Sequence, residues 1–298
     1  MSISLFSKCL LNKLMKRLEI ILIAILAVSA CELSYAQTAR SLFRVCDSLQ
    51  VSEIVSETGD QYEETGHHGP AVENSHMILR LFFNDSGAID VYSKSGRGME
   101  LERFKWYPSD SMKESGMSGG DAYTVANTLG LGGIALWDGE KQVNLVATKG
   151  RTARTGDTKK GTYAELIAYG VEYEGELVDV SIRIDVESKS REAVVTARSL
   201  TGKKICFVTG VNYHEGQKVV TEDGYISVWG VHSGQEDGFP IGAGLFYQPK
   251  VFPTVEKTSD MVRIISSPSA EVKTRIMSAS VREAEINNAK RFEAYMAK

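Results

Sequence analysis

The sequence has little of what marks several classes of protein. Of its 298 residues only 6 are proline and 4 are cysteine, no lysine- or arginine-rich run occurs, and the formal net charge is −4. This composition excludes collagen-like, coiled-coil and disordered chains. Binding to nucleic acid is not expected either, because a slightly acidic chain would need a segregated basic face to hold phosphates.

Several general motifs of catalytic and metal-binding proteins are also missing. No paired Cys-x-x-Cys spacing occurs, so we expect no structural zinc site, and we expect no other metal or cofactor. No Gly-x-Ser-x-Gly elbow of a hydrolase is present. Gly130, Gly132 and Gly133 lack the spacing of a dinucleotide fingerprint and lead into a strand pattern instead of a helix.

The first 36 residues have the pattern of an export signal. Lys13, Lys16 and Arg17 precede an apolar run from Leu18 to Ala30, and small residues follow. This run is too short for a membrane span, which needs about 20 residues. We therefore predict an exported protein with no membrane span.

Two cleavage patterns compete at the end of this signal. Residues 28–31 have the form of a lipobox, which would leave Cys31 as a lipidated N-terminus. Residues 34–36 have the small-x-small form of ordinary signal peptidase cleavage, which we favour. Either pattern predicts a periplasmic or extracellular protein, with a lipid anchor in the outer membrane under the first. Cys46 and Cys206 then remain, and either a disulfide or a small buried thiol at Cys206 is consistent with the sequence.

The rest of the chain has mostly the pattern of β-strands. Residues 177–187 alternate apolar with polar side chains, as a strand with one buried face does. Residues 77–83 and 88–93 flank a turn-rich tetrapeptide and predict a hairpin. Further strands are expected at residues 133–137, 142–147, 163–173, 192–200, 205–212, 225–231, 241–247 and 261–266.

This pattern predicts an all-β fold, an antiparallel sandwich of two large sheets, because no helix-length segments separate the strands. The exception is the C-terminal segment 282–298, where Ile286, Ala289, Phe292 and Met296 form one apolar stripe of an amphipathic helix. No linker-like tract or repeat occurs. We therefore expect a signal at 1–36, a lead-in at 37–65 and a single domain at 66–298.

A series of short segments carries a family resemblance. The segments are HHGPAVEN at 67–74, ILRLFF at 78–83, AIDVYSK at 88–94, WYPSD at 106–110, GDAY at 120–123 and TLGLGGIALWDG at 128–139. In this order they resemble the domain-of-unknown-function family 4861. The resemblance implies a large β-sandwich like those of mutarotases and several polysaccharide lyases.

The same resemblance implies a function. It points to a secreted protein of a bacterial polysaccharide-utilisation locus whose partner is an oligosaccharide or polysaccharide. The implied activity is that of a lyase or dehydratase, which eliminates water from uronic-acid-containing oligosaccharides. A non-catalytic glycan-binding protein of such a locus is the main alternative, and a glycoside hydrolase is another.

Elimination from a uronic acid needs a base for the C5 proton, an acid for the leaving oxygen, and donors that stabilise the carboxylate. Histidine and tyrosine suit the first two roles, and arginine or lysine suits the third. His67 and His68 are adjacent, so in an extended segment they would point to opposite faces and only one would reach a given cleft. We take His68, Tyr92 and Arg80 as the candidate catalytic residues. A surface-loop histidine is the alternative for His68.

Candidate substrate-binding residues lie on and beside the predicted hairpin. Glu73 and Asn74 precede the strand that carries Arg80, so they could bind sugar, or Glu73 could pair with Arg80 and fix the hairpin. Lys94 lies on the same face as Asp90 and Tyr92. It could hold a carboxylate if that face lines a cleft, and it is an ordinary surface residue otherwise.

Other candidate binding residues are more scattered. Asp121 follows two glycines and is either a polar anchor or a turn cap. Trp137 is either a core residue, which we favour, or a sugar-stacking platform. His214 and His232 each follow a predicted strand and could meet His68 if both strand ends open on one rim of the sandwich.

Overall fold

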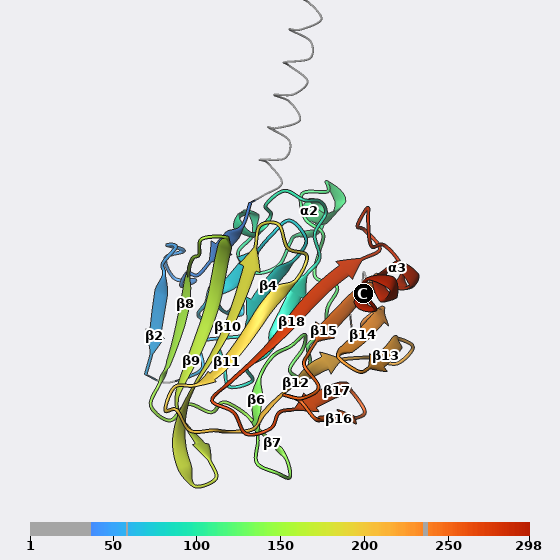
Figure 1. The fold of residues 1–298 in the computed structure, drawn as a ribbon. Helices are drawn as coiled ribbons and strands as arrows, with labels where there is room; N and C mark the ends of the chain where they lie inside the picture. Colours follow the sequence, from blue (N-terminus) through green and yellow to red (C-terminus); the bar gives the residue numbers. More distant parts are fainter. Residues whose placement is uncertain (1–36, 58, 235–237) are drawn as a thin grey trace, which may run out of the picture.

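The computed structural model describes residues 37–57, 59–234 and 238–298. The expected signal, with both cleavage patterns and Cys31, lies outside these residues. Within them the regular structure is almost entirely antiparallel β-sheet, arranged in three sheets (Figure 1). No helix in this part of the chain has the length and apolar character needed to cross a membrane.

The largest sheet has nine strands in the order β13-β14-β15-β18-β11-β10-β9-β8-β2. Their bounds are β2 Glu53–Ser56, β8 Arg151–Asp157, β9 Gly161–Tyr173, β10 Glu176–Glu187, β11 Ala193–Ser199, β13 Lys218–Glu222, β14 Tyr225–Gly230, β15 Ile241–Phe246 and β18 Glu271–Ser280. Figure 1 shows this sheet in front of the other two.

Two smaller sheets form the second layer. One has the order β1-β3-β4-β5 and the other β16-β17-β12-β6-β7. Their bounds are β1 Ala39–Ser41, β3 Ala71–Glu73, β4 Ile78–Leu81, β5 Ile89–Tyr92, β6 Ala135–Trp137, β7 Gln142–Val143, β12 Phe207–Asn212, β16 Thr254–Lys257 and β17 Met261–Ile265. Short helices are η1 Gly66–His68, η2 Leu101–Arg103, α2 Asp110–Glu114 and α3 Ala289–Met296.

The three sheets enclose one main hydrophobic core. Strands β3 and β4 contact β9, and β12 contacts β14 and β15, so both small sheets pack on the large one. Side chains from all three sheets, such as Leu79, Val180 and Val211, belong to the same buried cluster. The predicted antiparallel sandwich is confirmed. Its second layer is divided in two, where the sequence predicted one continuous large sheet.

A short segment after residue 129 joins the two parts of the second layer. Gly130 forms a parallel bridge with Ile89 of β5, and Leu131 forms an antiparallel bridge with Val211 of β12. Gly130 has φ +65°, and a Cβ there would lie 2.1 Å from the carbonyl oxygen of Ile89. Only glycine permits this close approach without strain.

Most of the predicted strands are present, with ends displaced by a few residues. The alternating segment 177–187 is β10, and the predicted hairpin is β4 paired with β5, in which Arg80 faces Asp90. Seven strands of the described residues were not predicted from the sequence, namely β1, β2, β3, β8, β13, β16 and β18. Among them, β1 and β2 lie in the lead-in 37–65 and pair with β3 and β8, so this segment is part of the sandwich.

The C-terminal helix is present but shorter than predicted. It begins at Ala289, after Asn288, whose side chain accepts a hydrogen bond from the Arg291 N–H at 3.0 Å. Residues 282–287 are therefore not helical, contrary to the prediction. The expected apolar stripe does face inward, and Phe292 and Met296 pack against β14, β15 and β18. Both Cys46 and Cys206 are free thiols, so the described structure has no disulfide between them.

Candidate functional site

The candidate site lies on the outer face of the four-stranded sheet. Alternation along β4 and β5 turns Leu79, Leu81 and Val91 into the main core. Arg80 and Asp90 consequently point to the opposite face, which residues 101–107 and Asp121 approach. The hairpin thus presents a row of polar side chains on the face opposite the main core, where loops cover them.

Arg80 is the centre of a buried polar network. Its Nε donates to Asp90 Oδ2 at 2.7 Å, and its Nη1 donates to the hydroxyl of Tyr92, which in turn donates to the Trp106 carbonyl. Asp90 also accepts the Val91 N–H at 2.7 Å. Arg80, Asp90 and Tyr92 are each at most 2% exposed. Their polar atoms have partners within the protein, so none of these three side chains offers an exposed group to a ligand.

Burial shifts the pKa of the Asp90 carboxyl. Desolvation raises the pKa of Asp90, and the positive charge of Arg80 opposes that rise.

The guanidinium of Arg80 also lies over the rings of Tyr92 and Tyr107, at 4.2 and 4.7 Å from the ring centroids. Cation–π contacts of this kind fix its plane.

His68 connects this network to the surface. Its Nδ1 lies 3.0 Å from the Tyr62 carbonyl and its Nε2 lies 3.0 Å from the Tyr107 hydroxyl. A carbonyl can only accept, so Nδ1 carries the ring proton. Burial lowers the pKa of His68 and keeps the ring neutral, so Nε2 accepts a hydrogen bond from the Tyr107 hydroxyl. Tyr107 is 44% exposed and is therefore the member of this pair that a ligand can reach.

The backbone at this histidine is strained. His67 and His68 have φ of 57° and 60°, a left-handed backbone conformation that residues other than glycine rarely adopt. Gly69 follows with φ 153°, and a Cβ there would lie 2.0 Å from the Leu81 carbonyl oxygen. The segment is a 3-10 turn and not an extended strand, so strand alternation does not separate the two rings. Strain of this kind clusters at functional sites.

The turn still separates the two histidines. His67 is fully buried, with ring centroids of Phe43 and Phe104 at 5.7 and 5.6 Å. Burial lowers the pKa of His67 to about 3. His68 instead stacks on Tyr62, with ring centroids 3.9 Å apart. His68 is therefore the histidine that bonds the exposed Tyr107, while the buried ring of His67 contacts Tyr92, with centroids 6.3 Å apart.

Asp121 completes the group. Its Oδ2 lies 3.6 Å from Arg80 Nη2, and its buried Oδ1 has no hydrogen-bond partner among the described residues. Burial and the negative charge of Asp90 raise the pKa of Asp121 to about 7. The carboxyl therefore exchanges a proton near neutral pH, which is the property required of a general acid or base.

A cleft adjoins the His68 side of the group. It has a volume of about 290 Å³ and includes Tyr62 and Phe82, both of which contact the His68 ring. Amide side chains of Asn84, Asn127, Gln142 and Asn144 also line it. An aromatic face beside several amide groups suits the mixed apolar and hydroxylated surface of a sugar.

Several of the predicted binding residues lie elsewhere. Glu73 and Lys94 form a buried ion pair with each other. The Asn74 side chain accepts hydrogen bonds from the N–H groups of residues 76 and 77 in the turn after β3. It also donates hydrogen bonds to the carbonyls of residues 187 and 190. Trp137 ends β6 with the guanidinium of Arg263 4.6 Å from its ring centroid.

His214 and His232 do meet each other, with ring centroids 4.6 Å apart. The N–H of Thr124 donates to His232 Nδ1 at 3.2 Å, and His214 Nε2 lies 3.2 Å from the Thr124 carbonyl. No ring contact or hydrogen bond joins either one to His68 in the described residues. The described residues also contain no group of three or more His, Cys, Asp or Glu side chains that could hold a metal ion.

Sequence reasoning did not single out Tyr107 or Tyr62. Tyr107 lies in the segment WYPSD, where two aromatic residues precede a proline, a loop pattern that could have drawn attention to it. No pattern in the sequence indicates that this loop folds back onto His68, because 39 residues separate the two.

These observations define an all-β sandwich protein with a buried arginine–carboxylate network beside a histidine–tyrosine pair. The chain belongs to the family described as a domain of unknown function, DUF4861, whose model matches residues 30–298. No curated protein matches the chain.

Some solved structures of sugar-active enzymes are distantly similar. A 4-α-glucanotransferase from Thermococcus litoralis is 11% identical with a TM-score of 0.36, covering 78% of this chain and 42% of its own. A polysaccharide lyase is 12% identical with a TM-score of 0.25, covering 75% and 34%. An α-galactosidase from Geobacillus stearothermophilus is 7% identical with a TM-score of 0.25, covering 76% and 40%. This chain thus spans less than half the length of each.

Proposed function

We propose that this protein is an exported carbohydrate-active enzyme of a polysaccharide-utilisation locus, which eliminates water from uronic-acid-containing oligosaccharides. The observation that carries the proposal is the neutral His68 bonded to the exposed Tyr107 hydroxyl, beside Arg80 and a carboxyl at Asp121 with a pKa of about 7. This set contains a base, an acid and a cation, which are the groups that such an elimination needs.

The histidine–tyrosine pair supplies the base. The Tyr107 oxygen takes the C5 proton of the uronate, while its own proton passes to His68 Nε2. The Tyr62 carbonyl holds Nδ1–H, so it fixes the tautomer that leaves Nε2 free to accept. The electron pair of the C5–H bond then forms the C4–C5 double bond, and the C4–O bond breaks.

Asp121 supplies the acid. With a pKa of about 7 its carboxyl is partly protonated at neutral pH and gives its proton to the departing C4 oxygen, which leaves as water. Arg80 is too buried to touch substrate. Its charge, held in place by Asp90 and Tyr92, stabilises the negative charge that develops during proton abstraction.

A specific observation also favours the alternative of a glycan-binding protein. Tyr107 is exposed and Tyr62 lines the cleft, where aromatic rings could stack on sugar without any chemistry. In that case Asp121 and His68 would serve only as hydrogen-bonding groups. The two functions differ in one measurable property, which is the formation of an unsaturated uronate.

The test is an absorbance assay at the unsaturated-uronate band, with purified protein and oligosaccharides that end in a uronic acid. We expect the absorbance to rise with the wild type. Tyr107→Phe should lower the rate by ~100-fold or more, because a positioned acid–base group contributes at least that much. The matched control is Tyr163→Phe on the large sheet, whose ring lies against Arg183 and which should leave the rate unchanged.

The possible outcomes separate the alternatives. Binding of the oligosaccharide without any rise in absorbance would support the glycan-binding protein and refute the enzyme. A full rate in both Tyr107→Phe and His68→Ala would refute the site while leaving the activity intact. Circular dichroism of each variant should match the wild type, which shows that a lost rate reflects chemistry and not unfolding.

A further inference from the structure

The cleft beside His68 has a lining that carries no ionised group, and we call it the amide cleft. None of the ten described residues that line it is acidic or basic: four are amides, two are hydroxyls, and the others are Tyr62, Phe82, Ala126 and Leu129. Burial raises the pKa of Tyr62, so its phenol is neutral as well. A ligand in the amide cleft therefore meets no charge from the lining itself.

Two arginines lie behind this lining, and each has a carboxylate partner. The guanidinium of Arg80 lies 5.4 Å from the centroid of the Phe82 ring and pairs with Asp90. Arg151 donates to a backbone carbonyl of the lining at 2.6 Å and pairs with Asp85. Both positive charges are compensated within the protein, so they do not draw an anion into the amide cleft.

Several amide groups of the lining are available to a ligand. The exposed side chain of Asn127 makes no hydrogen bond in the described residues. The side-chain oxygen of Asn84 accepts the N–H and the hydroxyl of Ser86, which leaves its amide nitrogen without a partner in the same part of the chain. The oxygen of Asn144 accepts from Gln142 at 3.0 Å, and its nitrogen is likewise unbonded there. Amides both donate and accept, as the hydroxyls of a sugar ring do.

The turn that carries Asn127 is fixed at the edge of the amide cleft. The hydroxyl of Thr128 donates to the Val125 carbonyl at 2.6 Å and accepts the Gly130 N–H at 3.1 Å. Ala126 has φ 50°, a left-handed conformation that residues other than glycine rarely adopt. Such a conformation persists only where the surrounding structure holds it. The turn thus presents Asn127 to the cleft in one defined conformation.

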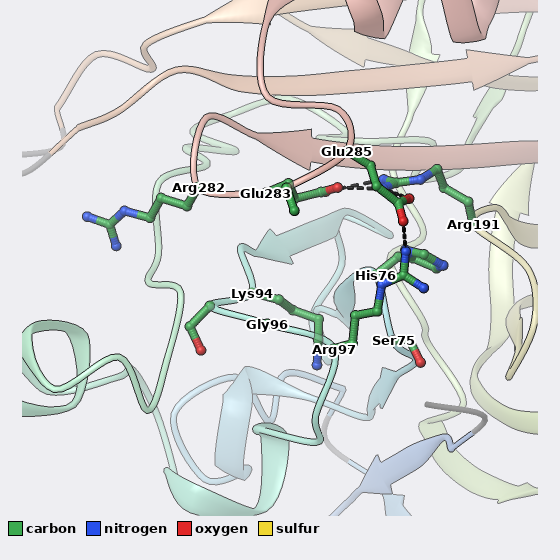
Figure 2. Close-up of a pocket in the computed structure, with 11 residues that line it drawn as sticks. Ser75, His76, Lys94, Gly96, Arg97, Arg191, Arg282, Glu283 and Glu285 are labelled. Atoms are coloured by element: carbon green, nitrogen blue, oxygen red, sulfur yellow. Dashed lines mark hydrogen bonds and ion pairs between the residues drawn. The ribbon is translucent and has the colours of Figure 1, made fainter. Parts of the chain in front are cut away.

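A cavity at the opposite end of the β4–β5 hairpin has a very different lining. It has a volume of about 160 Å³, and ion pairs join the residues around it, Arg191 with Glu283 and Arg97 with Glu285 (Figure 2). Buried Glu100 also accepts the N–H groups of residues 95 and 96 in its wall. An anionic sugar would have to break these pairs, so this cavity does not supply a subsite for a second uronate.

The proposed elimination determines which sugar residue lies in the amide cleft. Because the C4 oxygen leaves as water, C4 carries a free hydroxyl and the uronate is the terminal residue. The oligosaccharide then continues from C1 of the uronate. The cleft adjoins His68, whose ring stacks on Tyr62 and bonds the proposed base Tyr107. We therefore expect the cleft to hold the residue that is linked to C1.

We propose that the amide cleft binds an uncharged sugar ring, so that the preferred substrate is an oligosaccharide whose terminal uronate is linked to a neutral sugar. This inference rests on the proposed elimination for the identity of the terminal residue. A carboxylate on the second ring would lose water without finding a cation, which is unfavourable. The charge of Glu63, which acts on His68, would repel it further. The cleft volume of about 290 Å³ is at the lower end for ligand pockets and suits a single ring.

The first experiment compares two disaccharides that differ in one group. Both begin with D-glucuronate, which is β-linked to O4 of D-glucose in one and to O4 of a second D-glucuronate in the other. Calorimetry with Tyr107→Phe, in which we expect turnover to be ~100-fold slower, measures their binding. The disaccharide with the neutral second ring should bind ~10-fold or more tightly, because the second carboxylate is desolvated without a partner.

Substitutions of Asn127 in the same variant test whether the second ring lies in the amide cleft. Asn127→Ala should weaken binding of the neutral-ring disaccharide by ~3-fold or more, because a hydrogen bond is lost. Asn127→Lys should strengthen binding of the diuronate by ~3-fold or more, because it supplies a cation for the second carboxylate. The matched control is Gln248→Lys, which adds the same charge at an exposed amide outside the lining and should change neither affinity.

The results separate this inference from the elimination on which it rests. Equal or tighter binding of the diuronate would overturn the inference, as would no measurable binding of either disaccharide. Equal effects of Asn127→Lys and Gln248→Lys on the diuronate would overturn it too, because the second ring would then lie elsewhere. Preferred binding of the neutral-ring disaccharide without any rise in absorbance in the wild type would refute the elimination and still support a site for an uncharged sugar.

Discussion

The ion pair of Glu73 and Lys94 gives a quantitative test of the structure. Both side chains are almost fully buried, with 0% and 2% exposure. The Glu73 carboxylate also accepts the backbone N–H of Glu100 at 2.8 Å and of Leu101 at 2.8 Å. Lys94→Met would remove the cation and leave a buried carboxylate held by backbone amides alone.

The expected cost follows from these contacts. Removing one partner of a buried ion pair costs about 3–5 kcal/mol. Because the two amides remain, we expect the lower end, about 3 kcal/mol, which corresponds to ~6–12 °C in Tm for a domain of this size. Glu73→Gln combined with Lys94→Met should recover most of the loss, because the introduced carboxamide is neutral and its oxygen could still accept both backbone amides.

The loss should also depend on pH. Burial raises the pKa of Glu73 above its usual 4.5, and loss of Lys94 removes the charge that opposes this rise. The folded state then binds the proton more tightly than the unfolded state, so the deficit of Lys94→Met is greatest above the raised pKa and shrinks as pH falls through it. Urea denaturation at several pH values measures this directly. A deficit below about 1 kcal/mol, or one that grows in acid, would refute the buried-pair argument.

Two further predictions concern the candidate site and the joint between the small sheets. If Asp121 is the acid, the rate should fall as pH rises through about 7, and Asp121→Asn should remove that fall along with most of the activity; an unchanged pH profile in the variant would contradict the assignment. Gly130→Ala should cost about 2 kcal/mol or more in urea denaturation, because it adds a clash with Ile89 to a left-handed backbone. Gly139→Ala, also at positive φ but with open space around it, should cost only about 1 kcal/mol, and equal costs would count against the close approach.

The sequence predicted those parts of the fold in which alternation is regular. In β10 the apolar side chains from Val178 to Val186 are all buried, as expected of a strand with one face in the core. Strand β18 has a similar alternation through Val272, Thr274 and Ile276, yet it was not among the predicted strands. Strand β8 lacks such an alternation of apolar and polar residues. Its first residue, Arg151, is charged yet fully buried, and it donates hydrogen bonds to the carbonyls of other segments.

The candidate site, too, could be predicted from the sequence only in part. Arg80, Asp90 and Tyr92 share a face because hairpin register alone places them there, and this much can be read from spacing. Their roles could not be read, because burial of all three depends on the loops that cover them. Tyr107 and Asp121 approach the hairpin from loops, and no periodic pattern specifies where a loop folds back.

A single buried carboxylate connects the covering loops on this face. Glu100 Oε1 accepts the N–H and hydroxyl of Ser95, at 2.8 and 2.9 Å, just after the hairpin. Its Oε2 accepts the Gly119 N–H at 3.0 Å, two residues before Asp121, and the Gly119 carbonyl accepts from Arg282. Glu100 therefore joins the end of the hairpin to the loop that carries Asp121.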